Sequence, residues 1–394
     1  MFGTLTALPR MVRRSCLSAI CTGIRTAGLI LISSPFHTPA AAARPLFGVM
    51  LHAAEGSFIS HRQSWTSRIT LKPFIRLADG KGAVEMRNSP YFECHSLADG
   101  IYVLEAKRAW GAMSNAGVID MGTYTLVWDT FNTPAAGADL RLAAEELTGK
   151  PVRYVLNSHW HGDHVRGNQH FKDAVIVSTT RTRALMLSRQ QEWLSRMSAL
   201  LPQLERDIAD LRRGAADGAE AGKDTQLEML EDLKRSIMEL EITPAALTFE
   251  SALHLYGGRR MASFISVGAG HTECDAVLYL PEESILFTAD LTPVGNHPLL
   301  VDGNPASWLE ALDRLETYGA QRIVPGHGLV ADGAAVHVTR TYIRELTEYS
   351  RIPADAREEK MPDQYAGWAA AENYTRNLTW LREREKGSQS ERID

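Results

Sequence analysis

The stretch Asn157-Ser158-His159-Trp160-His161-Gly162-Asp163-His164 contains three histidines and one aspartate within six consecutive residues. Imidazole and carboxylate groups are the usual protein ligands of zinc and similar metals. The preceding residues, 152–156, are mostly β-branched or apolar and predict a buried strand that ends at this cluster. His159 and His161 can point the same way at a strand end, whereas the adjacent Asp163 and His164 diverge. The stretch therefore predicts a metal site with a second metal beside the first, rather than histidines exposed in a polar loop.

Three later segments extend this pattern. They are Gly270-His271-Thr272, Phe287-Thr288-Ala289-Asp290 and Val324-Pro325-Gly326-His327-Gly328. Together with residues 157–164 they resemble, in order, the HxHxDH signature, the third histidine turn, the bridging aspartate and the last histidine of the metallo-β-lactamase superfamily. The resemblance covers about residues 90 to 345. It implies an α/β fold, a four-layer αββα sandwich, to which this chain adds a helical-hairpin insertion.

The resemblance also implies a binuclear site with two Zn²⁺ ions, iron or manganese being the alternative metals, and no other cofactor. It assigns the first metal to His159, His161 and His271, the second to Asp163, His164 and His327, and both to Asp290. Asp163 would act as a catalytic residue that orients the nucleophile through its free carboxylate oxygen. Asp129, which follows an early strand, would support the site from behind the ligands.

The implied reaction is hydrolysis by a hydroxide shared between the metals, because metal binding brings the pKa of a water to about 7. A serine nucleophile is not needed, and the sequence has no G-x-S-x-G elbow. The expected substrate is a small molecule with an ester, thioester, lactone or amide-type bond. In the broad-range β-lactamases of the family a cysteine takes the bridging position and a lysine follows closely. Here Asp290 takes that position and no lysine occurs between Lys234 and Lys360, which resembles glyoxalase-II-like thioesterases and lactonases more closely.

Other functions remain open at this point. Taken overall, the sequence most resembles exported metallohydrolases found beside sulfur-oxidation and quinoprotein systems. The alternatives are a β-lactamase-type amide hydrolase and an iron-dependent enzyme of the same fold that oxidises sulfur or persulfide. No flavodoxin-like domain follows residue 345, which disfavours electron transfer from flavin. The net charge is −5 and basic residues are dispersed, so we expect no nucleic-acid partner and disfavour a nuclease.

The amino terminus has the layout of a secretory signal peptide. Arg10, Arg13 and Arg14 precede a run of small and apolar residues, and Ala40 to Ala43 offer a cleavage site. We predict a signal peptide over 1–43, a periplasmic or secreted enzyme, and export by the general or the twin-arginine route. The alternative is a disordered or interfacial amino-terminal helix. The apolar run is too short and too interrupted for stable membrane insertion. Residues 44–88 are expected to form an amino-terminal extension.

Four cysteines are too few for a disulfide scaffold. Cleavage near Ala43 would leave Cys94 and Cys274, which can pair in an oxidising compartment if they lie close together. Cys274 follows His271 by three residues, but we interpret it as a small buried residue because the ligand set is already full. His170, similarly, is interpreted as a substrate-facing or surface histidine rather than an eighth ligand.

The main domain is expected over 89–345, with short strands in 91–128, a helix over Ala135–Gly149, a hairpin over 276–287 and a last strand over Arg322–Pro325. Asn304 and Pro305 predict the start of a helix. Helical periodicity within 181–240, broken near Gly214–Lys223, predicts two antiparallel helices that serve as a lid, a packing annex or an oligomer surface. The oligomeric state is left open. The tail, 346–394, is expected to be helical and to pack through Tyr365, Trp368 and Trp380.

Overall fold

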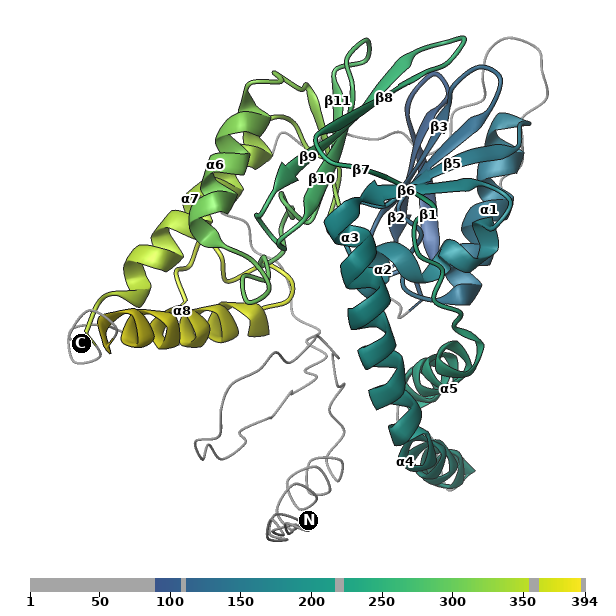
Figure 1. Cartoon of the computed structure of the whole chain (residues 1–394). Coiled ribbons are helices and arrows are strands. Elements are labelled where there is room, and N and C mark those ends of the chain that lie inside the picture. Colours follow the sequence, from purple (N-terminus) through teal and green to yellow (C-terminus); the bar gives the residue numbers. More distant parts are fainter. Residues whose placement is uncertain (1–88, 108–110, 217–222, 354–360, 391–394) are drawn as a thin grey trace, which may run out of the picture. The chain divides into compact units, whose positions relative to one another are not determined.

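A computed structural model describes residues 89–107, 111–216, 223–353 and 361–390, all within one compact unit (Figure 1). The predicted signal peptide, 1–43, and the amino-terminal extension, 44–88, lie outside these residues and stay predictions. Of the helices in the described ranges, none combines the length and the apolar character that crossing a membrane requires.

The described strands form two sheets of seven and five strands. The first sheet has the order β1 (Phe92–Ala98), β2 (Ile101–Ala106), β3 (Ala116–Asp120), β4 (Thr125–Trp128), β5 (Val152–Leu156), β6 (Val175–Thr179) and β7 (Leu247–Phe249). The second has the order β12 (Arg322–Pro325), β11 (Ile285–Ala289), β10 (Asp275–Leu280), β9 (Met261–Gly268) and β8 (Ala252–Tyr256). Strands β1 to β4 pair antiparallel, whereas β4 to β7 pair parallel, as do β11 and β12. The parallel pairs are those whose connections contain helices or long segments, as parallel strands require.

The two sheets pack face to face around an apolar core. Trp128 of β4 contacts Phe264 of β9 edge-on, with ring centroids 5.7 Å apart, and Phe287 of β11 at 6.2 Å. Gly117 of β3 makes room for this packing, because a Cβ there would lie 2.6 Å from the Phe287 ring. Large aromatic rings from both sheets therefore close the space between them and exclude water.

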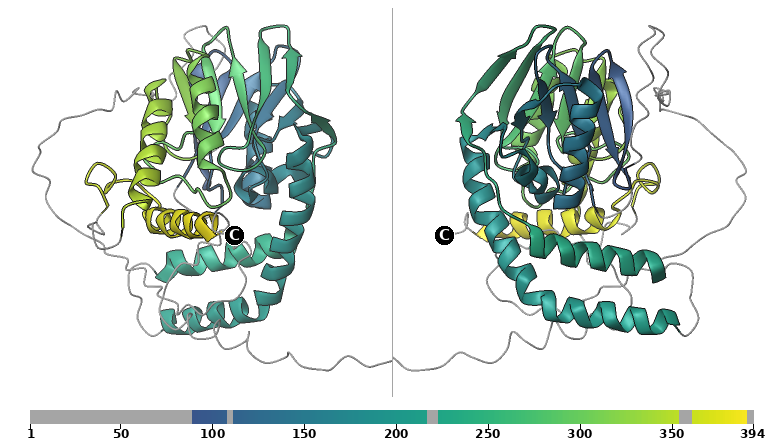
Figure 2. Two further views of the ribbon diagram at one scale, coloured as in Figure 1. Left: turned by 60° about the vertical axis from the view of Figure 1, so that its left-hand side comes forward. Right: turned by 90° about the vertical axis from the view of Figure 1, so that its right-hand side faces the viewer.

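Helices cover the outer face of each sheet (Figure 2). On the first sheet lies α1 (Pro134–Thr148), and on the second lie α6 (Pro305–Glu316) and α7 (Ala334–Ser350). The predicted α/β class and four-layer αββα sandwich are confirmed. The predicted start of α6 is also correct, since the Asn304 side chain accepts hydrogen bonds from the Ala306 and Ser307 amides at 3.1 and 3.3 Å.

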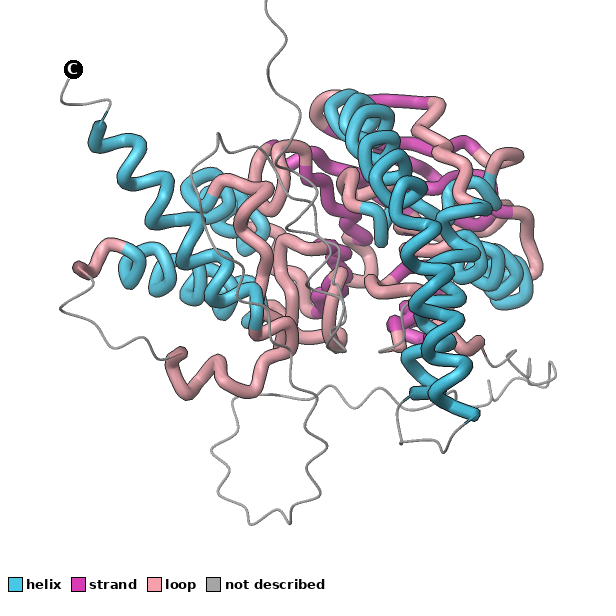
Figure 3. Tube along the Cα trace, turned by 90° about the horizontal axis from the view of Figure 1, so that it is seen from below, coloured by secondary structure: helices cyan, strands magenta, loops and turns pink. Residues whose placement is uncertain are grey.

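The insertion forms the expected hairpin (Figure 3). A short helix, α3 (Thr180–Leu185), leads through a single π-helical segment into α4 (Gln191–Ala216), which α5 (Lys223–Glu239) follows. Leu204 and Ile208 of α4 and Ile237 of α5 are buried, whereas Leu200 and Met238 are 39% and 67% exposed. The hairpin thus has one narrow apolar seam and a mostly solvated outer surface.

The carboxy-terminal segment packs on the second sheet's helices. Tyr365 and Trp368 contact Tyr342 of α7 with ring centroids 4.8 and 5.4 Å apart, and α8 (Glu372–Ser390) packs against α7. The predicted role of Tyr365 and Trp368 is confirmed, and Trp380 also packs, partly buried, against this core. Helix α7 itself runs past residue 345 without a break.

Cys94 and Cys274 are both free in this structure, so the disulfide that the sequence left open does not form. Cys94 lies on β1 of the first sheet and Cys274 directly before β10 of the second. Cys274 is buried, as the sequence analysis expected. Burial raises the pKa of both thiols to about 12, so neither is a reactive thiolate near neutral pH.

Candidate metal centre

The seven side chains predicted to bind metal meet where strands of both sheets end. The motif loop follows β5, His271 follows β9, Asp290 follows β11 and His327 follows β12. They form two groups, in each of which the candidate ligand atoms lie within 4.8 Å of one another. The first group is His159, His161, His271 and Asp290, and the second is Asp163, His164, His327 and Asp290. Asp290 is the residue common to both.

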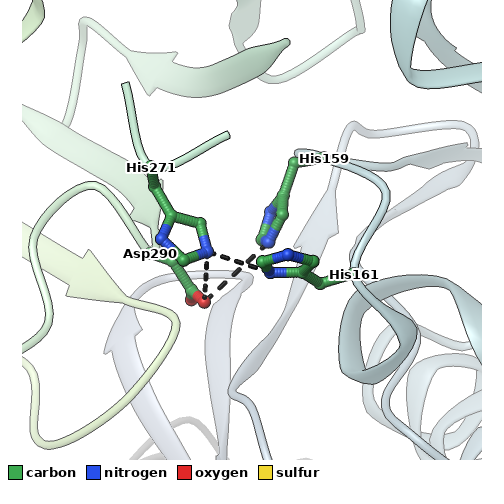
Figure 4. Close-up of side chains that lie close together, drawn as sticks. All are labelled: His159, His161, His271 and Asp290. Atoms are coloured by element: carbon green, nitrogen blue, oxygen red, sulfur yellow. Dashed lines mark hydrogen bonds and ion pairs between the residues drawn. The ribbon is translucent and has the colours of Figure 1, made fainter. Parts of the chain in front are cut away.

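In the first group three rings and one carboxylate converge (Figure 4). The Nδ1 atom of His161 lies 2.9 Å from Nε2 of His271. Asp290 Oδ2 lies 3.3 Å from His271 Nε2 and 3.8 Å from His159 Nε2. The atoms that face inward are therefore Nε2 of His159, Nδ1 of His161 and Nε2 of His271.

The other nitrogen of each of these rings is bonded to a fixed partner. His159 Nδ1 lies 2.9 Å from Ser158 Oγ, and His161 Nε2 lies 3.1 Å from Asp302 Oδ2. His271 Nδ1 lies 3.0 Å from the carbonyl oxygen of Leu299. Outer partners of this kind set the orientation and tautomer of a ligating histidine.

The second group has the same construction. His164 Nε2 lies 3.2 Å from Asp290 Oδ1 and 3.5 Å from Asp163 Oδ2. His327 Nε2 lies 3.3 Å from both Asp163 Oδ2 and Asp290 Oδ2. Behind the rings, His164 Nδ1 contacts Asp129 Oδ2 at 2.8 Å and His327 Nδ1 contacts the Met113 carbonyl at 3.1 Å.

Asp129 lies behind the site, where the sequence analysis placed it. Its carboxylate is fully buried and accepts hydrogen bonds from the amide and the hydroxyl of Ser158, both at 2.8 Å, as well as contacting His164. The backbone of Asp129 has a φ of 54°, a left-handed conformation that aspartate and asparagine tolerate better than most residues. These contacts support its predicted role behind the ligands.

The electrostatics differ between the two groups. Burial lowers the pKa of His159 well below its usual range and that of His271 to about 4, so both rings are neutral at pH 7, the form that binds metal. Burial would also lower the pKa of His327, but Asp290 and Asp163 outweigh it and raise that pKa to about 10. Burial opposes ionisation of Asp290 as well, yet His327 and His164 hold its pKa well below the usual range. Without metal, Asp163 and Asp290 thus favour the protonated form of the His327 ring.

The residues fit bound metal ions. Nε2 of His159, Nε2 of His164 and Oδ1 of Asp290 are buried, and none of them makes a hydrogen bond to a group outside the site. Buried polar atoms of this kind are costly unless something satisfies them. Five imidazoles and two carboxylates are the nitrogen and oxygen donors that Zn²⁺ binds, and iron and manganese accept them too.

Several supporting residues were not predicted from the sequence. Asp302 and Leu299 belong to the loop between β11 and α6, and Met113 lies before β3. None of them carries a sequence signal, because an aspartate or a backbone carbonyl in a loop is commonplace. His170 lies outside both groups, as expected, and so does Cys274.

The base of the insertion is also attached to the motif loop. Gln190 donates a hydrogen bond to the Trp160 carbonyl at 2.8 Å. Arg166 donates to Gln190 at 3.0 Å and lies over the Trp193 ring, 3.5 Å from its centroid. The first turns of the insertion therefore help to hold the loop that carries His159 and His161.

Comparison with known proteins identifies a family and several similar proteins. The family model described as the metallo-beta-lactamase superfamily matches residues 109–327. A linear primary-alkylsulfatase from a Pseudomonas species is 25% identical over 197 residues, which cover 48% of this chain and 36% of that protein. A metallo-beta-lactamase type 2 from Bacteroides fragilis is 21% identical over 272 residues, covering 65% of this chain and 87% of that protein. A solved metallo-beta-lactamase structure from Pontibacter korlensis aligns with a TM-score of 0.47 and 18% identity, over 64% of this chain and 99% of that chain. This chain thus spans just over a third of the alkylsulfatase's length.

Proposed function

The chain belongs to the metallo-β-lactamase superfamily, and from this premise we propose that it is a binuclear zinc hydrolase acting on a small molecule. The bond it cleaves is an ester, thioester, lactone or amide-type bond. The observation that carries the proposal is the pair of ligand groups that share Asp290. In each group the ring nitrogens not bound to outer partners face the shared carboxylate.

The residues divide the work as follows. His159, His161 and His271 would hold one zinc ion, Asp163, His164 and His327 the other, and Asp290 both. Bound zinc would lower the pKa of a water to about 7 and polarise the bond under attack. With zinc bound, Asp163 would accept a hydrogen bond from that water and orient it toward the substrate. Asp129, Asp302 and the Leu299 and Met113 carbonyls keep the rings in place, so that little reorganisation accompanies the reaction.

Sulfate-ester hydrolysis is a second candidate, favoured by the 25% identity to an alkylsulfatase over 197 residues. β-Lactam hydrolysis is a third, suggested by the 21% identity to a metallo-beta-lactamase. Asp290, with no lysine close behind it, favours the ester-type substrates over β-lactams. An iron-dependent sulfur-oxidising enzyme would use the same ligands. The identity of the bound metal distinguishes it from these candidates.

Elemental analysis of the purified protein, together with a substrate panel, tests the proposal. We expect close to two zinc ions per chain and turnover of at least one member of a panel of esters, thioesters, lactones, alkyl sulfates and β-lactams. Stoichiometric iron without zinc, together with oxidation of a persulfide, would replace the hydrolase by the redox alternative. A chain that binds no metal would refute both.

A further inference from the structure

The loop between β11 and α6, residues 290–304, holds two histidines of the first metal group from outside. The carbonyl oxygen of Leu299 lies 3.0 Å from His271 Nδ1, and Asp302 Oδ2 lies 3.1 Å from His161 Nε2. The loop also touches the His271 turn through its backbone, because the Asn304 amide donates to the Gly270 carbonyl at 3.0 Å. The position of this loop therefore sets the direction of both rings.

Helix α8 of the carboxy-terminal tail is hydrogen-bonded to this loop through Asn377. The Asn377 amide donates to the Pro298 carbonyl at 2.7 Å and accepts from the Leu300 amide at 2.9 Å. Asn377 is fully buried, so these bonds do not compete with water. The two contacts bracket Leu299, the residue whose carbonyl bonds to His271.

The geometry of the peptide bond links Asn377 to the metal group. The Leu299 carbonyl and the Leu300 N–H belong to the same planar trans peptide unit, so they point in opposite directions. Asn377 accepts from the N–H on one side of this unit, and His271 bonds to the carbonyl on the other. A rotation of this peptide would weaken both bonds together.

We infer that Asn377 is a positioning residue for the first metal group, acting on His271 through the Leu299–Leu300 peptide. This inference rests on the proposed metal binding. The carboxy-terminal tail would thus help to orient a metal ligand, although none of the proposed ligands lies on α8.

The test compares two asparagines of the same helix. Asn377→Leu keeps the branched shape of the side chain and removes both hydrogen bonds to the loop, together with the hydrogen bond between Asn377 and the Tyr342 hydroxyl. Asn373→Leu is the control on the same helix, because Asn373, which is half-buried, lies one turn earlier and donates to the His297 carbonyl at 3.1 Å, away from Leu299. Asn377→Asp retains an oxygen that can accept from the Leu300 N–H. Metal-free proteins are titrated with Zn²⁺ against a chelator and with Co²⁺ followed by its visible absorption, and thermal unfolding is recorded without metal.

We expect Asn377→Leu to weaken one of the two metal-binding steps by on the order of tenfold, the lower end of the range for losing an outer partner of a ligand. The Co²⁺ spectrum should change with it, and Asn377→Asp, which keeps the acceptor for the Leu300 N–H but loses the donor to the Pro298 carbonyl, should lose less affinity than Asn377→Leu. If Asn377→Leu does not fold, Asn377→Ser takes its place with the same expected result. A purely structural role would lower the unfolding temperature of both leucine variants and leave metal affinity and spectrum at the control values, which would overturn the inference. A wild-type chain that binds neither Zn²⁺ nor Co²⁺ would instead overturn the proposed function, and this inference with it.

Discussion

Replacing Asp129 by asparagine should impair both metal groups, because one carboxylate sets the tautomers of two ligands. As a carboxylate Asp129 only accepts hydrogen bonds, so His164 must carry its proton on Nδ1, 2.8 Å away, and present Nε2 to Asp290. The Ser158 hydroxyl donates to the same carboxylate at 2.8 Å and can therefore accept from His159 Nδ1 at 2.9 Å. His159 thus also presents Nε2 to the site. The two rings belong to different metal groups.

The Asp129→Asn substitution would reverse this chain of donors. The new amide nitrogen, in place of Oδ2, would face His164 Nδ1 and Ser158 Oγ as a donor, which favours the Nε2–H tautomer of both rings. That tautomer cannot bind metal through Nε2. Asparagine tolerates the φ of 54° at this position, so the backbone is kept. We expect each metal to bind about 10 to 100 times more weakly, a loss of about 1.4 to 2.8 kcal/mol at each site.

Zinc titration against a chelator measures both binding steps, and thermal unfolding of the metal-free protein reports on folding. Ser158→Ala is the matched control, because it breaks the relay to His159 and leaves the contact between Asp129 and His164 intact. It should weaken one binding step only. If Asp129→Asn binds two zinc ions as tightly as the native chain, the tautomer argument is wrong.

Two further predictions concern Asp290 and Glu105. Asp290→Ala should lose the metal of the second group preferentially, since two nitrogens and one carboxylate remain there. Turnover should fall by on the order of a hundredfold or more, and two bound metals with unchanged turnover would show that Asp290 is not a ligand. Burial, and then Glu93 directly opposite on β1, raise the pKa of Glu105 from 4.5 to about 7, so ionising Glu105 costs stability as the pH rises from about 4.5 to 7. Denaturant titrations should therefore find that Glu105→Gln is as stable as the native chain below pH 4.5 and more stable above pH 7 by about 1 to 3 kcal/mol. This range is reduced because Glu105 is partly exposed and His95 lies nearby. A stability difference independent of pH would contradict the prediction.

The features that depend on neighbouring residues could be predicted from the sequence alone. The spacing of His159, His161, Asp163 and His164 after a β-branched run located the motif at a strand end. The caps and glycine turns marked helices and hairpins, and the period of the apolar residues in 181–240 predicted two antiparallel helices. These properties are local, because burial patterns and capping hydrogen bonds involve residues close together in the chain. The resemblance of the four motif segments to a known family then supplied the ligand set.

The distant groups that support those ligands became visible only in the folded chain. Asp302 and Leu299 contact histidines 141 and 28 residues away, and Asn377 reaches the Leu299–Leu300 peptide from a helix in the tail. Most of these contacts use backbone carbonyls or single polar side chains, which have no period and no motif. For the same reason the sequence could not show whether Cys94 and Cys274 pair, because their distance depends on the strand order of two sheets. A polar residue in a loop acquires its role from the partner that folding brings to it, and that partner is not encoded in its neighbours along the chain.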